Sequence, residues 1–161
     1  MHNTIYEITT YPKKENDFLS QGDFYDHWFM KNVANRLDDN IDRNVYLNLF
    51  KDLLKNNNTG KFNLKNNSFA IIEQGKENYF NSKFEQFKES IKKLNKISLY
   101  DFSTSGNDIQ TEMYTLNNSF SEEYKIYISS DDGDIITFDK FIRDAEIGKN
   151  YYIGGILNYY Y

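Results

Sequence analysis

Apolar and polar residues alternate near both ends of the chain, as they do in β-strands that bury one face. Residues 4–10 set apolar side chains against polar neighbours, and Pro12 ends the pattern. Residues 151–159 alternate in the same way but are interrupted by Gly154 and Gly155. Two adjacent glycines inside a strand are typical of a bulge or of a close approach by another backbone segment. The two ends therefore predict an opening strand and a closing, interrupted strand.

Three segments repeat apolar residues at the helical period. The first covers residues 24–37 and follows Asp23, which we expect to cap it with Asp26 in a capping box. The second covers residues 42–55. The third shows the clearest pattern, a single stripe that consists of Phe80, Phe84, Phe87, Ile91 and Leu94. We therefore expect three main helices.

Shorter elements complete the pattern. Residues 62–71 and 124–138 each predict a β-hairpin, because alternating runs flank turn residues. Ser98 and Asp101 have the spacing of a capping box at the start of a short helical turn, and Asp139 is expected to cap another short helix. A further segment, residues 109–120, fits neither a helix nor a strand unambiguously.

Hairpins interleaved with helices, without a regular strand–helix–strand repeat, predict an α+β fold. We expect an antiparallel sheet of about four to six strands, packed with the three main helices and short helical turns. The chain has 161 residues, shows no internal repeat and has no linker-like composition, so we expect a single domain over residues 1–161.

Composition favours binding over catalysis. Aromatic residues make up 17% of the chain, with 14 Tyr and 13 Phe, whereas there is no Cys and there are only two His. Acid–base chemistry at neutral pH usually uses His or clustered carboxylates, while Tyr and Trp are enriched where proteins contact each other. We therefore expect no enzymatic activity, no cofactor and no metal site.

His27 is the one histidine in the interior of the sequence, and it follows Asp26 directly. Neighbouring residues of a helix do not face each other, so this pair is not a preformed catalytic dyad. A hydrolase that uses His27 needs a second group supplied by the fold, and Glu7, Asp101 and Asp144 stay open for that role. The simpler interpretation is a partly buried, hydrogen-bonded histidine.

The charge balance points to a basic partner rather than to nucleic acid. The formal net charge is −5 and the pI is about 5.1, which disfavours direct nucleic-acid binding through a broad basic surface. An acidic domain can instead be steered toward the basic groove of a protein that handles nucleic acid. The acidic candidates for partner binding are Asp38, Asp39, Asp42, Glu122, Glu123, Asp131, Asp132 and Asp134. They either form a solvated rim at turns and helix ends, or gather on one face toward the partner.

The Tyr-rich end of the chain supplies the aromatic candidates. Because a strand alternates its faces, about half of these rings are expected to face the core. We take Tyr152 and Tyr160 as the rings that contact a partner, either another protein or a second copy in a homodimer. The alternative is that they pack beneath neighbouring loops.

Nothing in the sequence predicts a membrane segment. No apolar run approaches the length of a transmembrane helix, and residues 1–12 lack the hydrophobic core of a signal peptide. The absence of Cys fits the reducing cytosol. We therefore expect a cytoplasmic protein with no membrane partner.

Three segments together, residues 23–29, 137–143 and 149–155, and the order of elements between them, carry a resemblance. The chain resembles small acidic accessory proteins of phages and mobile elements in low-GC bacteria, among them antirestriction and anti-CRISPR proteins. The resemblance implies a non-enzymatic inhibitor that occupies a protein surface or the nucleic-acid groove of a defence nuclease or CRISPR effector. The alternatives are an immunity protein that neutralises a cognate toxin, a dimerising structural module and, least favoured, the hydrolase that uses His27.

Overall fold

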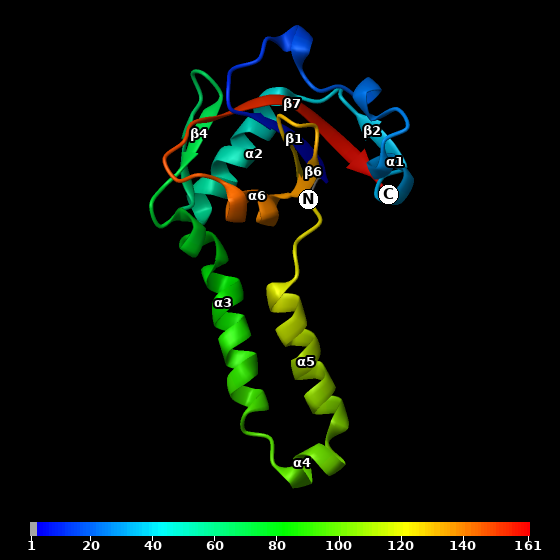
Figure 1. Cartoon of the computed structure of the whole chain (residues 1–161), viewed down its shortest axis with the longest axis vertical. Coiled ribbons are helices and arrows are strands. Elements are labelled where there is room, and N and C mark those ends of the chain that lie inside the picture. Colours follow the sequence, from blue (N-terminus) through cyan, green and yellow to red (C-terminus); the bar gives the residue numbers. More distant parts are fainter. Residues whose placement is uncertain (1–2) are drawn as a thin grey trace. The chain divides into compact units, whose positions relative to one another are not determined.

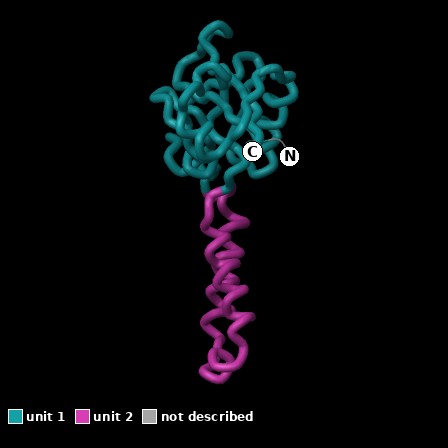
Figure 2. The backbone as a smooth tube through the Cα atoms, turned by 90° about the vertical axis from the view of Figure 1, so that its right-hand side faces the viewer, with its two compact units in different colours: residues 1–76, 123–161 teal, residues 77–122 magenta. Residues whose placement is uncertain are grey.

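The computed structural model describes residues 3–161, so His2 lies outside the described part of the chain. The chain forms two compact units, which Figure 2 distinguishes by colour. The first contains the described residues up to Lys76 together with Glu123–Tyr161, and the second is Glu77–Glu122. The single domain expected over residues 1–161 stays a prediction, and each unit is described by itself.

The first unit is built on a mixed β-sheet (Figure 1). Its strands are β1 (Thr4–Thr9), β2 (Arg36–Asp38), β3 (Gly60–Asn63), β4 (Ser68–Ile71), β5 (Ile126–Ser129), β6 (Ile135–Thr137) and β7 (Tyr151–Tyr160). Its helical elements are η1 (Glu15–Asp17), η2 (Gln21–Phe24), α1 (Trp28–Asn32), α2 (Arg43–Asn56) and α6 (Phe138–Asp144).

The order of hydrogen-bonded strands is β3-β4-β7-β1-β5-β6, and β2 also pairs with β7. The predicted α+β class is confirmed, but a purely antiparallel sheet is wrong, because β1 and β5 pair in parallel. These two strands are not joined by a hairpin, so no local turn fixes their relative direction. The described part of the chain has a seven-stranded sheet, more than expected, since β2 forms inside a segment that we predicted to be helical.

The sheet is covered on both faces, which is why all six residues of β1 are buried. On one face, Tyr6 contacts Phe50 of α2, and Phe50 in turn contacts Phe69 of β4 and Phe138 of α6. On the other face, Ile5 belongs to a buried cluster with residues of η2, α1, β2, β5, β6 and β7. The aromatic surplus of the sequence therefore serves the core to a large extent.

The helix predicted over residues 24–37 is wrong. Asp26 adopts a left-handed φ of 64° and His27 is extended, so only the five residues of α1 are α-helical. Leu37 pairs instead with Tyr159 as part of β2. Hydrogen bonding to β7 thus overrides the helical period of the apolar residues. The capping box also lies earlier than predicted, between Ser20 and Asp23 at the start of η2.

The predicted cap of the last short helix is wrong as well. Thr137, not Asp139, caps α6, with its hydroxyl accepting from the Lys140 amide at 3.2 Å. Asp139 is buried, and its carboxylate accepts a hydrogen bond from the Glu123 amide at 3.0 Å.

The other main elements are confirmed. Helix α2 begins after Asp42, whose carboxylate accepts from the Asn44 amide at 3.0 Å. Strands β3 and β4 form the first predicted hairpin and β5 and β6 the second. The glycines of β7 lie at the predicted bulge, where the pairing of β1 with β7 shifts in register.

The second unit is a helical hairpin. It consists of α3 (Gly75–Leu94, whose first two residues belong to the first unit), α4 (Leu99–Thr104) and α5 (Gly106–Phe120). Helix α3 was predicted, whereas α5 resolves the segment that the pattern left ambiguous. Lys83 donates to the Ser121 carbonyl at 3.0 Å, and Lys93 donates to Glu112 at 2.9 Å. These two contacts fix α3 and α5 as antiparallel neighbours, joined by α4 at the closed end.

The buried tyrosines of the first unit predict alkaline unfolding. The Tyr6 hydroxyl donates to the Tyr46 carbonyl at 3.1 Å, and burial, reinforced by the charge of Tyr46, raises the pKa of Tyr6 far above its ordinary value. A raised pKa contributes stability that is complete below the unfolded value of about 10 and is lost as the pH rises above it. We expect the free energy of unfolding to fall above about pH 10, and less steeply in Tyr6→Phe. Urea unfolding at a series of pH values measures both slopes, and equal slopes would contradict the assignment to Tyr6.

Candidate functional site

The closed end of the hairpin is held by the predicted capping box. The Ser98 hydroxyl accepts from the Asp101 amide at 3.1 Å, and the Asp101 carboxylate accepts from the Ser98 amide at 3.0 Å and from its hydroxyl at 2.6 Å. Hydrogen bonds from Ser98 lower the pKa of Asp101, so the carboxylate is ionised at neutral pH. Helix α4 therefore starts from a defined anchor although it has only six residues.

This anchored helix exposes its apolar side chains. Leu99 is 85% exposed, Tyr100 74% and Phe102 70%. Isolated exposed apolar residues are ordinary, but three within four positions concentrate exposed apolar surface on this short helix, and large exposed apolar surfaces mark interaction sites. We call Leu99, Tyr100 and Phe102 the tip. The sequence patterns did not identify the tip. The capping box of Ser98 and Asp101, followed directly by apolar residues, was the signal that could have found it.

The acidic candidates lie on separate elements. Asp38 ends β2 and accepts from the Asn40 amide at 3.0 Å, and Asp39, which follows the strand, accepts from the Gln21 amide at 3.4 Å. Asp42 caps α2. In the β5–β6 turn, Asp131 accepts from both the amide and the hydroxyl of Thr10, at 3.0 Å and 2.8 Å. Asp132 and Asp134 are exposed in the same turn, and Glu122 and Glu123 follow α5. Several of these carboxylates thus organise turns and caps, and a role in partner binding stays a prediction.

The two tyrosine candidates differ in exposure. Tyr152 is partly buried and pairs with Thr9 of β1 and Ser68 of β4, whereas Tyr160 is exposed near the end of β7. The guanidinium of Arg36 lies 5.7 Å from the centre of the Tyr160 ring, a cation–π contact. Strand β7 pairs with β1 on one side and with β4 and β2 on the other. A homodimer through the backbone edge of β7 would therefore have to displace existing strands.

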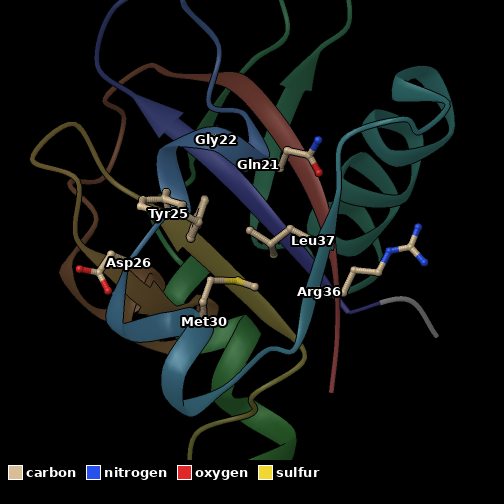
Figure 3. A pocket seen from close by; sticks show the side chains of 8 residues that line it. Gln21, Gly22, Tyr25, Asp26, Met30, Arg36 and Leu37 are labelled. Carbon is tan, nitrogen blue, oxygen red and sulfur yellow. The ribbon is translucent and has the colours of Figure 1, made fainter.

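Arg36 also lines a pocket of about 460 Å³ beside η2, α1 and β2 (Figure 3). Phe24, Met30 and Leu37 supply apolar walls, while Gln21 and Asp26 add polar groups. Asp26 is already paired with Lys31 at 2.6 Å. The pocket suits an apolar side chain better than a reacting substrate, because it combines apolar walls with charges that are engaged elsewhere.

The His27 side chain is hydrogen-bonded to the backbone. Its ring nitrogen Nδ1 accepts a hydrogen bond from the Phe29 amide at 3.2 Å and caps α1. The carboxylates left open as its partners are engaged with other groups: Glu7 with Lys13 and two amides, Asp101 with Ser98, and Asp144 with Lys140 at 2.9 Å. The geometry is that of a structural histidine rather than of an acid–base pair.

A buried polar network explains the two glycines of β7. Glu7 is 4% exposed, and its carboxylate accepts from the amides of Leu19 at 3.0 Å and Gly155 at 2.6 Å and pairs with Lys13 at 2.5 Å. A Cβ on Gly154 would lie 2.2 Å from the Glu7 carboxylate. The guanidinium of Arg43, on α2, donates to the carbonyls of residues 153 and 154 of β7. Burial lowers the pKa of Arg43. The network connects the loop after β1 to the bulge and engages both carboxylate oxygens of Glu7.

Among residues 3–161, no group of three or more His, Asp or Glu side chains is placed to hold a metal ion. None of the described helices combines the length and apolar character that crossing a bilayer requires. A comparison with protein-family models finds no match, and searches of curated proteins and of solved structures likewise find no similar protein. Among the described residues, the tip is the group of neighbouring apolar residues with the largest exposed fractions.

Proposed function

We propose that this protein is a non-enzymatic inhibitor that binds another protein through the tip. The single observation that supports the proposal is the exposure of Leu99, Tyr100 and Phe102 on a capped helix. A capped helix keeps its shape before binding, so less conformational entropy is lost when the partner covers it. Aromatic side chains on a preformed element are the usual centre of a protein–protein contact.

The free energy gained by burying the three side chains of the tip is large enough to support specific binding. Full burial of an apolar side chain of this size contributes roughly 1.5–3 kcal/mol relative to leaving it exposed. Three such side chains contribute several kcal/mol, and each 1.4 kcal/mol corresponds to a factor of ten in affinity. The tip can therefore carry much of the affinity of an interface, with charged residues adding selectivity at its rim.

We propose a defence nuclease or CRISPR effector as the target class. The net charge of −5 supports a partner with a basic surface, as proteins that handle nucleic acid have. The resemblance to antidefence proteins of mobile elements supports the same class. Inhibition then follows from occupying a surface or groove that the nuclease needs for its substrate.

The test compares the target affinity of a variant that lacks the aromatic rings of the tip with that of a variant that lacks an exposed ring elsewhere on the hairpin. Tagged wild-type protein is expected to recover one nuclease or effector from a lysate of the host and to inhibit it after purification. Replacement of Tyr100 and Phe102 by alanine is expected to weaken binding by about 1,000-fold, since each is expected to act as a hot spot that contributes about 2 kcal/mol. Tyr114→Ala, which removes an exposed ring from α5, is the matched control and should leave affinity unchanged.

Two results would contradict the proposal, and a third would remove only its electrostatic part. If the tip variant and the wild type bound the inhibited target with equal affinity, the target would bind a surface other than the tip. Turnover of a substrate by the purified protein would contradict the non-enzymatic class. Binding that does not weaken as salt is raised would remove the electrostatic part of the argument and with it the preference for a basic partner.

A further inference from the structure

The hairpin has a second exposed apolar surface, separate from the tip. It consists of Phe84 and Ile91 on α3 and Met113 and Phe120 on α5, and we call it the hairpin face. Their exposed fractions are 52%, 36%, 58% and 68%. On each helix the two residues are seven positions apart, which is two turns, so they point the same way.

The register of the hairpin brings the four residues together in two rows. The contacts of Lys83 with Ser121 and of Lys93 with Glu112 set the levels at which α3 and α5 meet. Phe84 and Phe120 therefore lie at one level, and Ile91 and Met113 lie at another, two turns nearer the closed end.

The four residues also lie on the same side of the hairpin. Each directly follows a shielded or partly shielded residue of the seam between the helices: Lys83, Ser90, Glu112 and Ser119. Because α3 and α5 run in opposite directions, the same rotation about each axis leads to the same side of the pair. Two helices alone leave such a side open to solvent, which is why a stripe that reads as a core face is exposed here.

The hairpin face is complementary to itself. A two-fold axis perpendicular to the helices, midway between the two rows, exchanges Phe84 with Ile91 and Phe120 with Met113. A second hairpin packed antiparallel on the first would then set each phenylalanine against an aliphatic side chain of the other copy. Alternation of large and small side chains is what allows helices to interdigitate, and Phe against Met adds a favourable contact between sulfur and ring.

The charges beside the face follow the same symmetry. The exposed outer side of α3 carries, in order, Glu85, Lys88, Glu89 and Lys92. Reversal of this order exchanges Glu85 with Lys92. In the antiparallel arrangement Glu85 meets Lys92 of the second copy, while the Lys88 ammonium lies 5.4 Å from the centre of the Phe84 ring on its own helix. Such pairs at the edge of a helical interface set partner choice and orientation.

We propose that the hairpin face binds a second copy of this chain and forms an antiparallel four-helix bundle. The four side chains expose roughly 400 Å² per copy, so the contact lies at the small end of specific interfaces and the dimer exchanges readily. The inference goes beyond the proposed function, because it uses a different surface and stands whatever the target of the tip is.

Sedimentation equilibrium and a charge exchange test the proposal. The wild-type chain of 19.2 kDa is expected to sediment as a dimer at about 200 μM, and Phe84→Asp is expected to remain a monomer. Lys92→Glu should weaken the dimer by about tenfold, since it sets two acids against each other. The double variant Lys92→Glu with Glu85→Lys should restore it. The two positions are seven residues apart on one helix, so restoration must arise between copies.

Cross-linking tests the orientation, since the chain contains no cysteine of its own. A mixture of Phe84→Cys and Ile91→Cys proteins is expected to form a disulfide between copies under mild oxidation. Phe84→Cys alone should not, because two copies of residue 84 are separated by about two turns. Circular dichroism confirms that each variant retains its helices.

A wild-type protein that sediments as a monomer of 19.2 kDa at this concentration would overturn the proposal. A dimer that forms equally well with Phe84→Asp would assign the contact to another surface and would overturn it too. Loss of target binding in Phe84→Asp, with no dimer in the wild type, would mean that a helix of the target covers this face. These outcomes are distinct from failure of the tip variants, which tests the proposed function alone.

Discussion

Replacing Glu7 with alanine is expected to lower the free energy of unfolding of the sheet-bearing unit by about 4 kcal/mol. The Glu7 carboxylate accepts hydrogen bonds from the amides of Leu19 and Gly155 and pairs with the ammonium of Lys13. Alanine would leave two shielded amides without an acceptor, each at a cost of about 1–3 kcal/mol, and would open a cavity. Urea unfolding followed by circular dichroism measures the loss as a shift of the midpoint of about 2 M.

Two controls separate hydrogen bonding from loss of charge. Glu7→Gln keeps one oxygen that can accept from the amides, and we expect about half of the loss. Asp17→Ala removes an exposed carboxylate from the same loop and is expected to change stability by less than about 0.5 kcal/mol. A Glu7→Ala protein that unfolds at the wild-type midpoint would show that the network is dispensable.

The same network shows how far sequence reasoning reaches. Gly154 and Gly155 predict a bulge or a close approach by another backbone segment, and the structure has both. The pairing of β1 with β7 shifts there, the Leu19 backbone lies against Gly155, and the Glu7 carboxylate lies against Gly154. The sequence pattern could not name Glu7 as the cause, since residue 7 is far from the glycines along the chain and reads as the polar position of an ordinary alternating strand.

Elements that form by local rules were predictable, whereas elements that depend on distant pairing were not. Ser98 caps α4 as expected, because a cap needs only neighbouring residues. Asp139 does not cap α6 as predicted, because its carboxylate instead accepts from the amide of Glu123, which is distant in sequence. Arg36 and Leu37 fall within the predicted helix, yet they pair with β7, which lies more than a hundred residues away. The parallel pairing of β1 with β5 is of the same kind.

The candidate surfaces depend on burial, which periodicity does not report. The stripe on α3 reads as a core face, but only part of it is shielded, because a single helix packs beside it in the hairpin. In the same way, Leu99, Tyr100 and Phe102 look like core residues of a short turn and are exposed. Apolar residues predict that a segment needs a partner, and only the structure tells whether the chain itself provides that partner.

Phe50→Ala is expected to produce a loss of similar size, about 4 kcal/mol, by a different mechanism. Phe50 is 1% exposed, and its ring contacts rings from three strands and from α6: Tyr6, Phe62, Phe69 and Phe138. Removal of the ring forfeits its transfer free energy and leaves a cavity that these four rings, each held by its own element, can fill only in part. The measurement is again the urea midpoint.

The matched control is Leu49→Ala, one position earlier on the same helix. Leu49 is about half exposed, so we expect a loss below about 1 kcal/mol. Equal losses for the two variants would mean that burial of Phe50 in the aromatic cluster does not set its contribution to stability. A large loss for Phe50 alone would instead show that α2 stabilises the fold by joining β1, β4 and α6, which are distant in sequence.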